Sequence, residues 1–202
     1  MPVTDVRHDL DALTLTITAD FAAPVERVWQ VYADPRQLEK VWGPPSYPAT
    51  VVDHDLRPGG RITYFMTGPE GDKHAGYWEV STVDEPAGFT FSDGFADLDF
   101  TPNPDLPVSK NVYTFTPHQD GTRAVYVSTF ASAEGLQQVL DMGVVEGATS
   151  AINQIDGLVA SRGAARTLRG VIVGLRVTLR DESSAESPAR AVLSGPFAVP
   201  VA

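Results

Sequence analysis

The residues best suited to chemistry are an acid and three other proton-transfer groups that lie among apolar positions. Glu146 is one residue away from the apolar face expected for the segment 133–160, where desolvation would raise the pKa of its carboxyl group. Tyr64, His74 and Tyr113 are further candidates for acid–base work of the kind that a cyclase or hydrolase performs. Glu146 could equally lie on a solvated flank of the helix. No spacing selects a catalytic pair, so the catalytic residues stay undefined.

Other reactive chemistries lack their sequence motifs. The chain contains no Cys, which excludes disulfides, thiolate metal sites and a Cys nucleophile. The four His stand apart without the spacing of metal ligands, so no metal site is expected. No Ser lies in a nucleophile elbow, and no glycine-rich phosphate loop occurs. We therefore expect no metal and no cofactor.

Two glycines four residues apart, Gly143 and Gly147, fall on the apolar face of the predicted helix. Each costs about 1 kcal/mol of helix stability relative to Ala, so some other interaction should compensate. The missing side chains could leave room for a ligand, or they could let the helix approach a sheet closely. Both interpretations are open at this stage.

Aromatic and soft side chains could line a pocket beneath that helix. Tyr and Trp combine an apolar body with one polar atom, which suits a ligand cavity, although each residue could also be ordinary core. Together with the helix glycines, the set favours a cavity. The expected ligand-binding residues are Trp42, Tyr64, Met66, Trp78, Phe91, Phe95, Tyr113, Phe130, Met142, Gly143, Glu146 and Gly147.

Hydrophobic periodicity predicts the elements that position these residues. Alternation over 13–18 predicts a strand, Ala23-Pro24 opens a short helix, and a second short helix runs from Pro35 to Trp42. Three- and four-residue steps over 133–160 predict one long amphipathic helix with Ser132 as its N-cap. Six more strands are expected at 48–57, 61–67, 74–84, 88–95, 110–117 and 122–131.

This order predicts an α+β fold. A curved antiparallel sheet of seven strands has one apolar face, which the long C-terminal helix and the two short helices after the first strand would cover. Such an arrangement can enclose a pocket between helix and sheet. We divide the chain into a lead (1–11), a domain (12–160) and an extension (161–202) that is disordered or adds a strand. The extension differs in charge, with six Arg against three acidic residues.

A set of short motifs in this order is similar to a known family. The chain resembles, over residues 12–160, the "activator of heat-shock-protein ATPase homologue"-like branch of the START-like (SRPBCC) superfamily. The resemblance implies the helix-grip fold, and its members include hydrophobic-ligand carriers, aromatic polyketide cyclases and a co-chaperone domain. Val41 departs from the family, which often has a second Trp there. The matching segments are 21–29 (FAAPVERVW), 41–44 (VWGP), 55–60 (DLRPGG), 76–80 (GYWEV), 120–122 (DGT) and 140–147 (LDMGVVEG).

Charge and hydropathy limit the partners. A net charge of −11 disfavours nucleic acid, whose phosphates select basic surfaces. No apolar run approaches the roughly 20 residues of a membrane span, and no secretory signal opens the chain, so a cytoplasmic protein, monomeric or homodimeric, is expected. We predict a protein that binds a small hydrophobic or aromatic molecule. An enzyme using the same cavity and a chaperone-associated regulatory module remain as alternatives.

Overall fold

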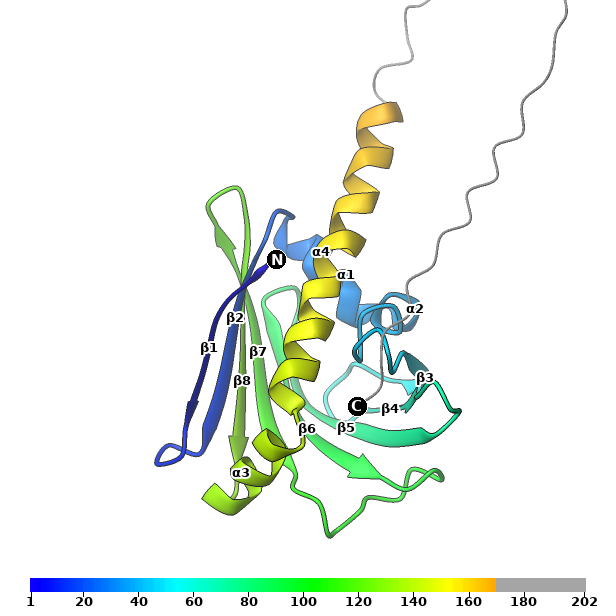
Figure 1. Ribbon diagram of the computed structural model, residues 1–202. Coiled ribbons are helices and arrows are strands. Elements are labelled where there is room, and N and C mark those ends of the chain that lie inside the picture. Colours follow the sequence, from blue (N-terminus) through cyan, green and yellow to red (C-terminus); the bar gives the residue numbers. More distant parts are fainter. Residues whose placement is uncertain (170–202) are drawn as a thin grey trace, which may run out of the picture.

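Eight antiparallel strands form one curved sheet in the computed structural model, which describes residues 1–169 and the side chains of residues 1–160. Every neighbouring pair follows in chain order except β2 and β8, which bring the start of the chain beside the last strand (Figure 1). The spatial order is β1-β2-β8-β7-β6-β5-β4-β3. The strands are β1 (Val3–Asp9), β2 (Thr14–Phe21), β3 (Ala49–His54), β4 (Arg61–Thr67), β5 (Lys73–Asp84), β6 (Gly88–Ala96), β7 (Ser109–His118) and β8 (Gly121–Phe130).

The eighth strand, β1, corrects the expected count of seven, because it occupies part of the lead 1–11. Five of its seven residues are exposed and three are charged, so no apolar alternation marks them as a strand. The ladder with β2 holds β1 in place, and the Val3 N–H donates to Asn153 Oδ1 at 3.2 Å. The α+β helix-grip architecture expected from the sequence is otherwise confirmed.

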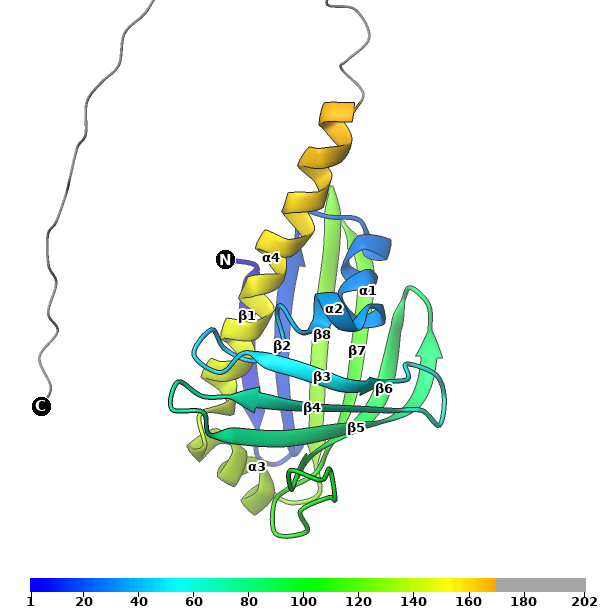
Figure 2. The same ribbon diagram turned by 90° about the vertical axis from the view of Figure 1, so that its right-hand side faces the viewer.

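Within residues 1–169, four helices accompany the sheet on or beside its concave side. They are α1 (Val25–Ala33), α2 (Pro35–Leu38), α3 (Ala133–Asp141) and α4 (Val144–Arg169). Figure 2 shows α4 running across the strands, with α1 and α2 beside it and α3 at its lower end. The two short helices follow β2 as predicted, and α2 ends at Leu38 rather than at Trp42.

The prediction of one continuous helix over 133–160 is wrong, because the helix is interrupted between α3 and α4. Ser132 caps α3 as predicted, accepting a hydrogen bond from the Gly135 N–H at 3.1 Å. Gly143 at the break has φ +75°, a left-handed conformation that favours glycine. Helix α4 then continues to Arg169, past the predicted boundary at 160. The strand considered further along the extension lies outside the described residues.

Gly143→Ala should lower the free energy of unfolding by about 1 kcal/mol, because a Cβ is strained in the left-handed conformation. Gly157→Ala is a matched control within α4. No atom lies within 4 Å of where its Cβ would be, so we expect it to raise stability by up to about 1 kcal/mol. Urea denaturation measures both changes, and effects of the same sign would contradict this assignment of Gly143.

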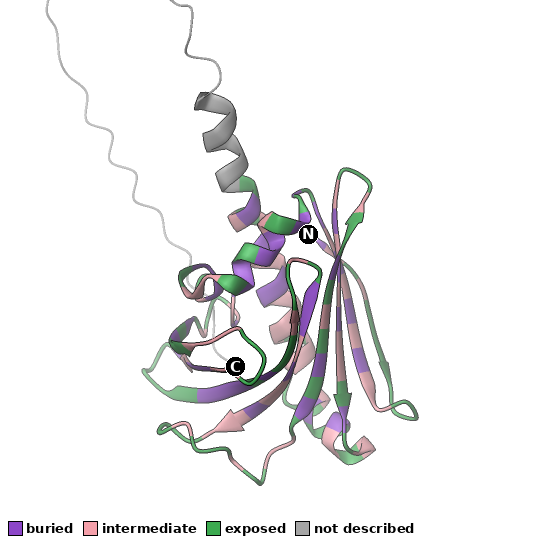
Figure 3. Ribbon diagram, turned by 180° about the vertical axis from the view of Figure 1, so that it is seen from behind, coloured by how far each residue is buried: buried purple, intermediate pink, exposed green. Residues whose placement is uncertain are grey.

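The main core lies where α1 faces the sheet (Figure 3). Trp78 is fully buried, and its ring centroid lies 4.4 Å from Phe91 and 4.8 Å from Trp42. From α1, Trp29 packs edge-on against Phe89 with the centroids 5.9 Å apart. Edge-to-face pairs of this kind add to the stability gained from burial alone. This side of the interior is filled with aromatic rings.

Helix α4 is held firmly along its middle and less closely at its start. The Arg27 guanidinium of α1 donates to the Leu158 carbonyl at 2.8 Å, and Gln154 Nε2 donates to the Gly43 carbonyl at 2.7 Å. Ile152 and Ile155 are buried, whereas no residue of 144–150 is. The first turns of α4 therefore leave space between the helix and the sheet.

Candidate functional site

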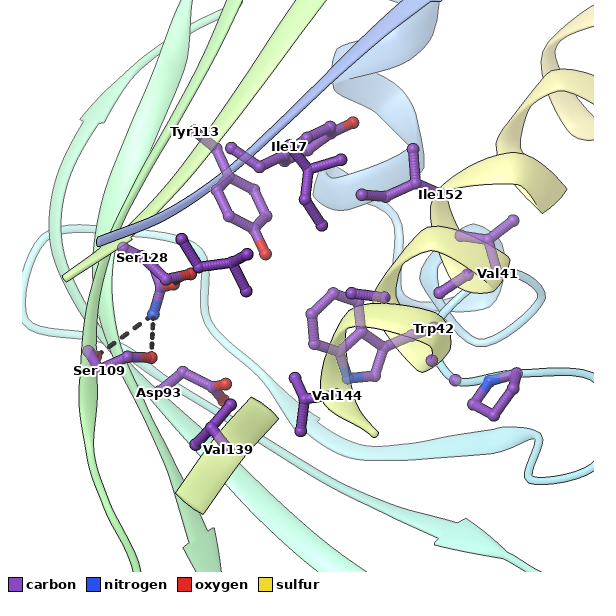
Figure 4. A pocket seen from close by; sticks show the side chains of 18 of the residues that line it. Ile17, Val41, Trp42, Asp93, Ser109, Tyr113, Ser128, Val139, Val144 and Ile152 are labelled. Carbon is purple, nitrogen blue, oxygen red and sulfur yellow. Dashed lines mark hydrogen bonds between the residues drawn. The ribbon is translucent and has the colours of Figure 1, made fainter. Parts of the chain in front are cut away.

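A cavity of about 250 Å³ occupies that space between the first turns of α4 and the concave face of the sheet (Figure 4). Strands β2, β4, β6, β7 and β8 form its floor, and residues of α1, α4 and the segment after α2 form its walls. Most of the lining is aliphatic or aromatic. Interiors of proteins are normally close-packed, so a void of this size distinguishes this region from the filled core beside it.

Part of the cavity floor is polar. Asn111 and Ser109, two positions apart on β7, point to the same face of the sheet, and Ser128 is the β8 partner of Asn111. Asn111 Nδ2 donates to Ser109 Oγ at 3.0 Å, and the Ser128 hydroxyl donates to Asn111 Oδ1 at 2.6 Å. The short chain of hydrogen bonds satisfies these buried groups and fixes their positions.

Asp93 on β6 is the ionisable acid of this floor. Burial in apolar surroundings raises the pKa of its carboxyl group to about 7, and the neighbouring Tyr64 and Trp78 side chains offset only part of that rise. The Tyr64 hydroxyl donates to Asp93 Oδ1 at 3.3 Å, while the Trp78 indole N–H lies beside the carboxyl without full hydrogen-bond geometry. Asp93 is half-buried and lines the cavity. A carboxyl group with this pKa can exchange a proton near neutral pH.

The tyrosines that line the cavity are neutral hydrogen-bonding groups. Burial raises the pKa of Tyr64, Tyr113 and Tyr32 well above the ordinary value, so none ionises near neutral pH. The Tyr32 hydroxyl donates to the Tyr126 hydroxyl at 2.9 Å and is thereby satisfied. The described hydrogen bonds give the Tyr113 hydroxyl no such partner, and in Figure 4 it points into the cavity.

Two glycines shape the site. A Cβ on Gly147 of α4 would meet no atom within 4 Å, so this glycine borders open space and does not serve close packing against the sheet. A Cβ on Gly76 of β5 would stand 2.5 Å from the Tyr64 hydroxyl. Gly76, the cross-strand partner of Tyr64, therefore lets the phenol lie across β5 towards Asp93.

The structure brings seven of the twelve expected ligand-binding residues to the cavity: Trp42, Tyr64, Met66, Phe95, Tyr113, Phe130 and Gly147. Trp78 and Phe91 are buried in the aromatic core next to the cavity and do not line it. Met142, Gly143 and Glu146 are exposed around the α3–α4 junction. The break at Gly143 explains this difference, because a straight helix through 133–160 would have placed all three close to the apolar face. His74 is also exposed and pairs with Asp72 at 3.2 Å.

Sequence reasoning missed the polar floor, including its acid. The signal for Asp93 was present in β6, where the alternate residues Phe89, Phe91, Asp93 and Phe95 share one face. A carboxylate in phase with three phenylalanines is expected on the buried side of the strand. The same alternation along β7 places Ser109 and Asn111 in phase with Tyr113.

The described part of the chain shows neither a cluster of metal ligands nor a helix suited to span a membrane. No group of three or more His or acidic side chains comes together there as a set of metal ligands. Within residues 1–169, no helix combines the length and the apolarity that a membrane span requires.

Comparison with known proteins supplies the family context. The family model described as "Activator of Hsp90 ATPase homolog 1-like protein" matches residues 22–160. The chain is similar to a crystal structure of a Mycobacterium smegmatis protein, with 80% identity, 78% of this chain and 96% of that chain covered, and a TM-score of 0.74. It is also similar to a solution structure of an Arthrobacter aurescens protein, with 42% identity, coverage of 79% and 92%, and a TM-score of 0.76. No curated protein matches the chain.

Proposed function

This chain belongs to the activator of Hsp90 ATPase homolog 1-like family, and we propose that it binds a small apolar or aromatic molecule between α4 and the sheet. The observation that carries the proposal is the cavity of about 250 Å³ bordered by Gly147. Ligand pockets in proteins usually measure about 300–1,000 Å³, so this one favours a compact molecule of two or three rings. The aromatic and aliphatic lining supplies the burial that would drive binding.

One observation favours a second function, which is catalysis in the same cavity. The Asp93 carboxyl group has a pKa of about 7 and lies 3.3 Å from the Tyr64 hydroxyl, so it could donate or accept a proton in a cyclase- or hydrolase-like reaction. Binding is the simpler proposal, because it needs only the shape and lining of the cavity. Turnover that Asp93→Asn abolishes while ligand affinity persists would favour the enzyme.

Filling the cavity from α4 tests the binding function. Gly147→Phe places a ring in the open space beside the cavity, whereas Gly157→Phe places the same ring on the exposed side of the same helix. We expect two- and three-ring aromatic compounds to raise the melting temperature of the wild type and of Gly157→Phe but not of Gly147→Phe. A ligand at 100 times its Kd stabilises a protein by about 2.7 kcal/mol, which a thermal-shift assay detects readily.

Circular dichroism at 20 °C checks that both variants keep the native fold. Equal thermal shifts for Gly147→Phe and the wild type would place the ligand elsewhere on the protein. The absence of any shift across the whole panel would contradict the proposed function for ligands of this size.

A further inference from the structure

The cavity lining carries a negative charge that no positively charged lining residue among 1–160 balances. Asp93 is the only carboxylic acid among the described lining residues, and no Lys, Arg or His accompanies it there. None of the salt bridges found in the described part of the chain involves Asp93. An anionic ligand such as a fatty acid would meet a second carboxylate in an apolar site without any counter-charge, which is strongly unfavourable.

Asp93 also has free capacity to accept hydrogen bonds. An ionised carboxylate offers about four acceptor sites. Among the described hydrogen bonds, only the one from the Tyr64 hydroxyl occupies an acceptor site of Asp93. Its oxygen–oxygen distance of 3.3 Å is long for a bond of this type. The group that would satisfy the remaining sites best is a donor that also carries positive charge, because charge-assisted bonds are the strongest.

Aromatic side chains surround the space in front of this carboxyl group. In Figure 4 the Asp93 side chain points towards the side of the cavity where Val144 and Trp42 lie, and Tyr113 lies above it in the view. Trp42 and Tyr64 meet edge to face with their ring centroids 5.8 Å apart, so the two rings present surfaces in different directions. Ring faces attract cations, and they also stack on apolar ring systems.

We propose that the occupant of the cavity is a hydrophobic amine, with its ammonium group on Asp93 and its rings among Trp42, Tyr64 and Tyr113. This inference rests on the binding function proposed above and names the class of ligand. Ser109, the β7 partner of Asp93, offers a hydroxyl oxygen to a second N–H of the ammonium group. The aliphatic side of the cavity, towards Ile152, would contact the edge of those rings that lies farthest from Asp93.

The proposal predicts that the affinity for an amine increases with pH. The burial that raises the pKa of Asp93 to about 7 leaves the carboxyl group mostly neutral at pH 5, so an ammonium ion must displace its proton in order to bind. The titratable groups that face Asp93 are Tyr64 from β4 and Tyr113 from β7, and both stay neutral because burial raises their pKa. The described lining residues of α4 include no titratable group.

Three ligands of one shape test the class. Isothermal titration at pH 8 compares 2-naphthylmethylamine, 2-naphthalenemethanol and 2-naphthoate on the full chain. We expect the amine to bind at least about tenfold more tightly than the alcohol, as a hydrogen bond to a charged group implies, and naphthoate to bind most weakly. Lowering the pH to 5 should remove most of the preference for the amine.

Two neutralising substitutions complete the experiment. Asp93→Asn should remove the preference for the amine, and Asp120→Asn, which removes one charge from an exposed turn, should retain it. An alcohol that binds the wild type as tightly as the amine, or an undiminished preference in Asp93→Asn, would overturn the inference and leave the binding function standing. Failure of all three ligands to bind would overturn the binding function and the inference with it.

Discussion

Asp93→Asn should raise the free energy of unfolding by up to about 4 kcal/mol at pH 8 and change it little at pH 4. At pH 8 the wild-type carboxyl group is ionised inside an apolar cavity, and the neutral amide of nearly the same shape removes that cost. At pH 4 the carboxyl group is already neutral in the folded protein. Urea denaturation over pH 4–8 measures the difference.

The direction of this effect follows from the raised pKa. Between about pH 4, the ordinary value for Asp, and about pH 7, the folded chain binds the Asp93 proton more tightly than the unfolded chain does. The stabilisation that comes from this tighter proton binding is complete below the pKa of Asp93 in the unfolded chain, and it is lost as the pH rises to about 7. Asp120→Asn is the control for a general change in charge. If Asp93→Asn raised the free energy of unfolding by the same amount at pH 4 and at pH 8, the carboxyl group of Asp93 would not lie in the apolar surroundings described.

Trp78→Ala should lower the free energy of unfolding by roughly 3–5 kcal/mol, the usual cost of removing a large aromatic side chain from a packed core. Trp78 is fully buried, with ring neighbours at 4.4 Å and 4.8 Å. Phe95 is half-buried and borders the cavity, so Phe95→Ala should cost only about 1 kcal/mol. Chemical denaturation of both variants at one pH makes the comparison.

The contrast between these two aromatic residues tests the asymmetry of the interior. A filled interior on the α4 side would give Phe95→Ala a cost close to that of Trp78→Ala. A large difference would agree with a packed region under α1 and a hollow region under α4. The comparison needs no ligand and is therefore independent of the proposed function.

The sequence predicts the sheet well, because strand periodicity is a local property. Strand β4 was expected at 61–67 and spans Arg61–Thr67, since turn residues bound it on both sides. The edge strand β1 was not predicted because most of its side chains are exposed and carry no apolar alternation. The ladder with β2 is a long-range interaction that local periodicity does not contain.

The site was harder to predict than the sheet, because it depends on how the helix sits on the sheet. Gly143 turns α4 away from the direction of α3, so Glu146 faces out and Gly147 borders the cavity. The interpretation of Glu146 as a buried acid depended on one straight helix over 133–160. Asp93 could have been found from the alternation in β6, had a charged residue in phase with phenylalanines been given more weight than the helix.

A crystal structure determined under xenon pressure tests the central claim most directly. Apolar cavities bind xenon, and the side of this cavity away from the polar floor is lined by aliphatic and aromatic side chains. The account predicts a xenon site beside Gly147, between Ile152 of α4 and Tyr113 of β7. An interior without bound xenon there, filled instead by the side chains of Trp42 and Phe95, would contradict it.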